Sequence, residues 1–259
     1  MSTLAPDVNA DLTSNATPAL TKVEAGAPFK WIQQGVLDFR SAPLLSLLYG
    51  ALFAGFCAAV YIAIRNAPWF TLAYLTGLVV VGPFVAAGLY AANRDMERGL
   101  KPSIRGSLRV ISKRKTYLAL FALMLTLLMA AWVRFSALLF AVASSTLTPT
   151  ADAYTKLLSS PDGWLTLAFF VGAGMLLVTV VFVFSAVSIP YILDKDVNFI
   201  EAMSTSYRTV INNPAAMLIW AGAIVVLTAA GIATAFIGLA VIFPVLGYAT
   251  WHSYRALVK

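Results

Sequence analysis

The residue types that carry most catalysis and metal binding are scarce in this chain of 259 residues. It contains a single histidine, His252, and a single cysteine, Cys57. Haem, copper and zinc centres need several such ligands, and an intrachain disulfide needs two cysteines. The sequence also shows no nucleophile–base arrangement and no phosphate-binding glycine motif. We therefore expect a protein that is not an enzyme and that binds no metal or cofactor.

Ionisable residues that could carry protons or cations through a membrane are also missing from the middle of the long apolar runs. None of the 11 acidic residues lies there, although ion pathways usually place an ionisable group within the membrane. Arg134 comes nearest, and its long side chain can extend to the outer interface. Ion translocation through buried charges is therefore not expected.

Basic residues, in contrast, are concentrated between Arg94 and Lys115. Such a cluster can hold anionic lipid headgroups at about 1 kcal/mol per charge. Nucleic acid is not expected as a partner, because membrane topology alone already accounts for this charge. The residues expected to bind lipid headgroups are Arg105, Arg109, Lys113, Arg114 and Lys115.

Long apolar runs determine where these residues lie. Hydrophobic residues make up 60% of the chain and charged residues only 11%, whereas soluble domains have about 25% charged residues. Runs of roughly 17–25 apolar residues span a bilayer, and in lipid they must be helices. We predict an all-α polytopic membrane protein with six transmembrane helices, at about 44–64, 69–92, 116–134, 164–193, 214–230 and 232–251.

The first 28 residues differ from the rest in composition. They are rich in Ala, Thr, Ser, Asn and Pro and contain no large apolar cluster, so they cannot bury enough surface to become ordered. They also lack the basic start and apolar core of a signal peptide. We predict a disordered, uncleaved tail at 1–28, followed by a six-helix membrane domain at 29–259.

The layout repeats three times, as a hairpin of two spans preceded by an amphipathic segment. These segments are 31–42, 103–113 and 199–211, and Asn198 and Glu201 have the spacing of an N-cap pair at the third. We expect interfacial amphipathic helices on the cytoplasmic side. In the alternative, they bend inward and pack on the cytoplasmic end of the bundle.

Prolines occupy corresponding places in the three copies. Pro43 and Pro214 open spans 1 and 5, where a helix tolerates a missing N–H group. Inside a helix, proline frees a carbonyl and bends the axis. Helix kinks are therefore expected late in spans 2, 4 and 6, either as static packing features or as hinges, at Pro83, Pro190 and Pro244.

The distribution of positive charge predicts the orientation. All but three of the 18 basic residues fall on one side of the six predicted spans, and the exceptions are Arg65, Arg134 and Lys156. The positive-inside rule places that side, with both termini, in the cytoplasm. The protein is expected to be multi-pass, with the lipid bilayer and its anionic headgroups as partners.

Several motifs resemble those of a known family. The stretch 35–43 reads GVLDFRSAP, 82–84 reads GPF, 88–90 reads GLY, and 94–99 reads RDMERG. With Tyr49-Gly50 and Pro102-Ser103, they resemble the bacterial integral-membrane family called domain of unknown function 2189, across about 30–255. The resemblance implies a six-span protein of the bacterial inner membrane.

Members of this family often carry the label cytochrome c oxidase subunit I. That subunit needs several haem and copper histidines, whereas this chain has only His252. We expect instead an accessory, assembly or regulatory subunit of a larger membrane complex, respiratory or otherwise, or a homo-oligomer. The alternative is a small-molecule transporter or channel with a polar cavity lined by Thr71, Tyr74, Thr76, Thr179, Ser185 and Ser188.

The predicted topology can be tested with a reporter that is active only outside the cytoplasm. Fused after Lys259, it should give no signal, because the basic residues hold that side in the cytoplasm. A strong signal from this fusion would reverse the orientation.

Overall fold

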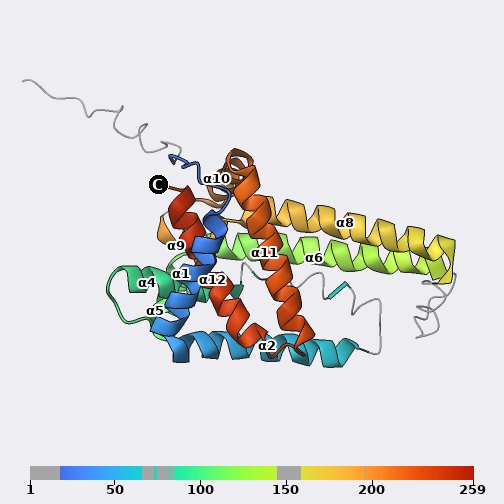
Figure 1. Cartoon of the computed structure of the whole chain (residues 1–259), viewed down its shortest axis with the longest axis horizontal. Coiled ribbons are helices and arrows are strands. Elements are labelled where there is room, and N and C mark those ends of the chain that lie inside the picture. Colours follow the sequence, from blue (N-terminus) through green and yellow to red (C-terminus); the bar gives the residue numbers. More distant parts are fainter. Residues whose placement is uncertain (1–17, 66–72, 75–81, 83–84, 145–158, 196) are drawn as a thin grey trace, which may run out of the picture.

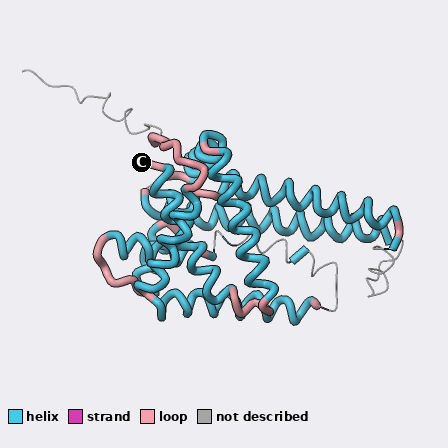
Figure 2. Tube along the Cα trace, in the orientation of Figure 1, coloured by secondary structure: helices cyan, strands magenta, loops and turns pink. Residues whose placement is uncertain are grey.

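The computed structural model describes residues 18–65, 73–74, 82, 85–144, 159–195 and 197–259 (Figure 1). Helices dominate these residues, and Figure 2 shows only loops and turns between them. The prediction of an all-helical protein is confirmed. The helices are α1 (Ala27–Ser41), α2 (Pro43–Ile64), α4 (Ala87–Glu97), α5 (Ile104–Lys113), α6 (Lys115–Ser144), α8 (Pro161–Ser185), α9 (Ser188–Asp194), α10 (Phe199–Asn212), α11 (Pro214–Ala233) and α12 (Leu239–Leu257).

Four helical segments are long and apolar enough to cross a membrane. They are Pro43–Ile64, Lys115–Leu139, Gly163–Asp194 and Pro214–Ala233, and they match predicted spans 1, 3, 4 and 5. As predicted, Pro43 and Pro214 stand at the starts of α2 and α11. Only 17% to 22% of each apolar window is buried inside the protein. Most of this apolar surface therefore needs an apolar environment outside the chain.

The other two predicted spans have different outcomes. Most of span 2, at 69–92, lies outside the described residues. Span 6 was expected from residue 232, but α11 continues to Ala233 and α12 begins only at Leu239. The turn between them uses positive φ angles at Ala235 and Phe236, and the Thr234 hydroxyl accepts a hydrogen bond from the Gly238 N–H. A continuous apolar sequence carries no signal for such a turn.

Helix α12 is the central element of the fold. It packs against α1, α2, α4, α9 and α11, and Figure 1 shows it crossing beside α1. Its large aromatic side chains Tyr248, Trp251 and Tyr254 are almost fully buried. Helix α12 is less apolar than the four candidate spans. It can be so because its buried side chains contact other helices and need not face lipid.

A glycine and a proline bring α2 and α12 into close contact. Pro244 lies inside α12 and has no N–H group, so the Ala240 carbonyl loses its helical partner. A Cβ atom on Gly50 of α2 would overlap that carbonyl. Phe53 and Phe243 stack beside this contact, with ring centroids 3.9 Å apart. Glycine is therefore needed at position 50 because the two backbones meet there.

Helices α6 and α8 form a long hairpin that extends away from the other helices (Figure 1). The ring of Trp132 packs on Phe170, with centroids 5.0 Å apart. It also contacts α8 at Gly174, where an added Cβ would meet it at 3.2 Å. Helix α6 continues to Ser144, beyond the end predicted near Arg134.

The three amphipathic segments form helices where the sequence predicts them, as α1, α5 and α10. The Asn198 side chain caps α10 by accepting a hydrogen bond from the Glu201 N–H at 2.8 Å. Each helix turns small residues inward, namely Gly35 on α1, Ser107 on α5, and Ala202 and Ser206 on α10. They pack on α12, α4 and α9 respectively.

Residues 18–28, which fall within the tail predicted at 1–28, contact the C-terminal end of the chain. Thr21 N–H donates to the Leu257 carbonyl, and Lys259 N–H donates to the Ala19 carbonyl, both at 3.0 Å. The Val23 N–H donates to the Asn213 side chain at 2.9 Å, and α1 already begins at Ala27. Backbone pairing holds this stretch although it has few large apolar side chains. Residues 1–17 lie outside the described residues.

A pair of glycine substitutions on α2 tests the close contact with α12. Gly50→Ala should lower the free energy of unfolding by about 1–3 kcal/mol, because its Cβ overlaps a backbone carbonyl. Gly55→Ala is the matched control, since a Cβ there meets nothing within 4 Å. It should be neutral or stabilise the helix by up to about 1 kcal/mol. Thermal unfolding in detergent measures both, and equal effects would contradict the contact.

Candidate functional site

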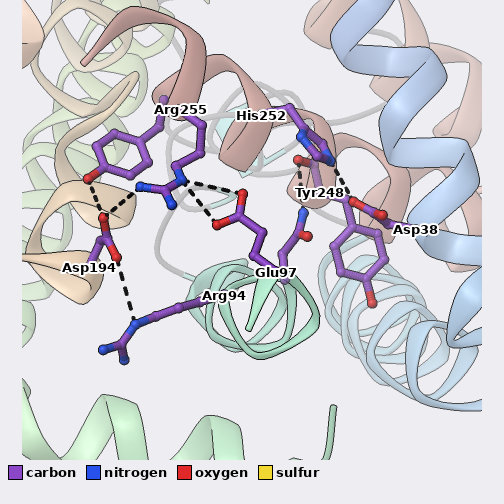
Figure 3. Close-up of polar contacts among 9 residues, drawn as sticks. Asp38, Arg94, Glu97, Asp194, Tyr248, His252 and Arg255 are labelled. Carbon is purple, nitrogen blue, oxygen red and sulfur yellow. Dashed lines mark hydrogen bonds and ion pairs between the residues drawn. The ribbon is translucent and has the colours of Figure 1, made fainter. Parts of the chain in front are cut away.

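The main polar cluster of the described structure lies where α4, α9 and α12 meet (Figure 3). We call it the charged junction, and it consists of Arg94, Glu97, Asp194, Tyr254 and Arg255. Asp194 ends α9 and is at its centre, with a side chain only 9% exposed. One carboxylate oxygen accepts hydrogen bonds from the Tyr254 hydroxyl at 2.8 Å and the Arg255 guanidinium at 3.2 Å. The other lies 3.8 Å from Arg94 Nε.

Arg255 links this carboxylate to a second one. Its Nε lies 3.0 Å from a Glu97 carboxylate oxygen, and its guanidinium stands 5.9 Å from the centre of the Trp251 ring. Arg94 and Glu97 occupy neighbouring turns of α4, whereas Tyr254 and Arg255 end α12. Two arginines and two carboxylates therefore join three helix ends, with the charges balanced.

A second polar contact joins α1 to α12. His252 Nε2 lies 2.5 Å from an Asp38 carboxylate oxygen, and both side chains are about one-fifth exposed. One turn earlier on α12, the Tyr248 hydroxyl shares a hydrogen bond of 2.9 Å with Ser46 of α2. The Tyr248 carbonyl accepts a bond of 3.4 Å from Asn93 of α4. One face of α12 is thus tied to three helices, and Figure 3 shows the contact between His252 and Asp38.

The electrostatics of the charged junction favour these pairings. Burial lowers the pKa of Arg94, and the positive charge of Arg98 lowers it further, while Asp194 opposes both. Burial lowers the pKa of Arg255, but its hydrogen bond to Glu97 and the charge of that carboxylate outweigh this effect, so the pKa rises. Burial and the Asp194 carboxylate raise the pKa of Tyr254. Tyr254 therefore stays a hydrogen-bond donor and both arginines stay charged near neutral pH.

This arrangement suits a structural clamp better than a reaction centre. The Asp194 oxygens already face three donors, which leaves this carboxylate poorly placed to act as a base. Across the described parts of the chain, no three His, Cys, Asp or Glu side chains gather where they could hold a metal ion. The His252 ring nitrogen already contacts the Asp38 carboxylate, and Cys57 is buried in α2.

The residues predicted to contact lipid headgroups lie apart from the charged junction. Arg105, Arg109 and Lys113 are exposed on α5, Arg114 is partly buried after it, and Lys115 is exposed at the start of α6. These five basic residues lie along one short segment and do not surround a pocket. Their arrangement therefore indicates a binding surface, not a closed site.

The predicted kinks have three outcomes. Pro83 lies outside the described residues. Pro190 lies in the first turn of α9, and the helix is interrupted just before it, between Ser185 and Ser188. Pro244 lies inside α12, and α2 packs against the Ala240 carbonyl that lacks a helical N–H partner because of this proline. Both described prolines therefore occupy packed positions.

The sequence did not predict the charged junction, since Glu97 and Asp194 look like ordinary surface acids there. One signal was present: Arg94 follows Pro83 at the same spacing at which Arg255 follows Pro244. In the predicted repeat, that spacing gives the two arginines corresponding positions. It does not reveal that the intervening carboxylate comes from a third helix.

Comparison with known proteins gives one match. Residues 71–194 match a family described as predicted integral membrane protein (DUF2189), which confirms the resemblance noted in the sequence. The matched region includes the motifs at 82–84, 88–90, 94–99 and 102–103, but not those at 35–43 and 49–50. No curated protein and no solved structure matches the chain.

Substitutions at Asp194 and Glu97 test whether the buried carboxylate dominates the charged junction. Asp194→Ala should lower the free energy of unfolding by about 2–3 kcal/mol, because Tyr254 and Arg255 lose their shared acceptor and Arg94 loses its opposite charge. Glu97→Ala should cost less than about 1 kcal/mol, since its pair with Arg255 is more exposed. Asp194→Asn, which keeps an acceptor for Tyr254, should fall between them. Equal losses at both sites in detergent unfolding would contradict this ranking.

Proposed function

We propose that this protein is a non-enzymatic, multi-pass protein of the bacterial inner membrane. It would act as an accessory, assembly or regulatory subunit of a larger membrane complex, for which a respiratory complex is one candidate. The observation that carries this proposal is the contrast between the two kinds of surface. In the charged junction, Asp194 and Glu97 are paired with arginines, whereas the candidate spans keep most of their apolar surface for contacts outside the chain.

Contacts of span 2 favour a six-span arrangement. The Tyr74 hydroxyl donates to the Cys57 carbonyl at 2.9 Å, and the Trp132 indole N–H donates to the Ala73 carbonyl at 3.2 Å. Further along the chain, Gly88 lies against the Tyr49 ring. Tyr74 therefore lies at the level of Cys57, and Gly88 lies at the level of Tyr49, nearer the start of α2. This order is the one expected of the second helix of a hairpin.

Contacts of α12 favour a sixth span. Residues 21–23 connect the end of α12 to the start of α11 through Thr21 with Leu257 and Val23 with Asn213. Because α11 is a candidate span, α12 returns across the same depth, shielded by its neighbours. The N-terminal and C-terminal segments then share one side, and the excess of basic residues places that side in the cytoplasm.

The helix pairs support three repeated hairpins. In the first two copies, the second helix of a hairpin packs on the amphipathic helix that follows it, as α4 does on α5 and α9 on α10. Helix α12 packs instead on α1, from the other end of the chain. The backbone pairing of Leu20 with Val258 takes the place of a covalent loop. These contacts support the proposal of a closed ring of three similar units.

The transporter alternative has less support. Thr71 and Thr76 lie outside the described residues. Thr179 is exposed and its hydroxyl donates to the Met175 carbonyl of its own helix, while Ser188 is buried and donates to carbonyls of Phe184 and Ala202. Hydroxyls used in this way do not line a shared polar path.

Crosslinking in native membranes tests the accessory role. The exposed Ala51 and Gly55 lie one turn apart on α2, and small residues let helices approach closely in lipid. Mild solubilisation, crosslinking and mass spectrometry should recover a reproducible larger complex or a homo-oligomer. Ala51→Leu/Gly55→Leu should reduce its yield at least severalfold.

Gly172→Leu on α8 is the matched control, because a Cβ there also meets nothing within 4 Å. It should leave the complex intact. A protein that stays monomeric, and whose proteoliposomes take up a solute at a saturable rate, would favour the transporter alternative.

A further inference from the structure

Helix α5 and the residue stretch before it expose two adjacent rows of side chains. Leu100, Ile104 and Leu108 form an apolar row spaced by four residues and are 57%, 42% and 58% exposed. Each is followed directly by a basic residue, so a basic row runs alongside. The exposed members of this basic row are Lys101, Arg105, Arg109 and Lys113.

The basic row lies in a segment that carries no negative charge of its own. The segment from Arg98 to Lys115 contains no Asp or Glu. In the described residues, no carboxylate forms an ion pair with Arg105, Arg109 or Lys113. In contrast, Arg94 and Arg255 form ion pairs with Asp194 and Glu97. An uncompensated row of positive charge is therefore a distinctive feature of this helix.

The opposite face of α5 holds the two rows in place. Ser107 is fully buried and its hydroxyl donates to the Gly88 carbonyl of α4 at 3.0 Å. The Ser103 side chain caps the helix by accepting from the Gly106 N–H at 3.0 Å. Two residues after Lys113, α6 begins the apolar stretch Lys115–Leu139, which is a candidate span. The contacts with α4 and the helix cap thus fix the two rows next to the N-terminal end of that candidate span.

From this geometry we infer that α5 is a docking surface for anionic phospholipids. Arg105, Arg109 and Lys113 bind the phosphate and other negative groups of the headgroup, while Ile104 and Leu108 lie among the first carbons of the acyl chains. Charge complementarity selects anionic over zwitterionic lipid, and the apolar row selects a lipid over a free anion. This inference rests on the membrane placement proposed above, but it requires no partner subunit.

Lipid binding to the full chain in a neutral detergent provides the test. Phosphatidylglycerol should bind more tightly than phosphatidylcholine and less tightly as salt is raised. Arg105→Gln/Arg109→Gln/Lys113→Gln should weaken phosphatidylglycerol binding roughly a hundredfold, at about fivefold per charge. Leu108→Ser should also weaken it. Arg105→Lys/Arg109→Lys should retain most of the affinity, which separates loss of charge from misfolding.

Lys22→Gln/Lys30→Gln/Arg40→Gln is the control, because it removes three exposed charges near α1 instead. It should leave phosphatidylglycerol binding nearly unchanged. An equal loss in the control, or equal binding of phosphatidylcholine, would overturn the inference. So would competition by inorganic phosphate at concentrations similar to those of the lipid. Because these measurements use purified protein, they are independent of whether the crosslinking experiment finds a partner complex.

Discussion

The Asp194 carboxylate is the interaction on which the packing of the helix ends depends. It is placed where α4, α9 and α12 converge, and it accepts from Tyr254 and Arg255 while lying beside Arg94. A partly buried carboxylate is stable only when donors replace the water that it loses. The three helix ends must therefore keep their relative positions for this charge to remain satisfied. The same requirement orients α12, which every other part of the fold contacts directly or through one neighbour.

Close backbone contact is the second constraint, and it also concerns α12. Gly35 of α1 and Gly50 of α2 both meet the backbone of this helix, and neither site has room for a Cβ atom. In lipid there is little hydrophobic force between helices, so close van der Waals packing contributes much of their association. Pro244 adds to this by freeing a carbonyl at the point where Gly50 approaches. Small residues and a proline thus allow a helix with many aromatic side chains to occupy the centre.

The outer surfaces divide into two kinds with different chemistry. The candidate spans present aliphatic and aromatic side chains with no fixed partners, as on the α6–α8 hairpin, where Leu127, Phe169 and Leu176 are each more than 60% exposed. Such surfaces suit acyl chains or other transmembrane helices. Helix α5 combines an apolar row with a basic one, which suits the boundary between acyl chains and headgroups. We propose that the first surface meets partners within the membrane and the second meets its charged edge.

Residue patterns along the chain were enough to predict the helical class, the four long candidate spans and the places of helices α1, α5 and α10. Length, apolar composition and periodicity encode these features locally, and Pro43, Pro214 and Asn198 mark helix starts through simple backbone chemistry. The side chains that meet across the chain could be identified only once the helices were packed together. It joined Asp194 to arginines on two other helices, paired His252 with Asp38, and placed residues 19–23 beside the C-terminal end. It also set the start of α12, because positive φ angles at Ala235 and Phe236 depend on packing around the turn rather than on residue type. Local sequence patterns indicate which helix surfaces are apolar. Which helix packs against which depends instead on contacts between residues that are distant in the chain.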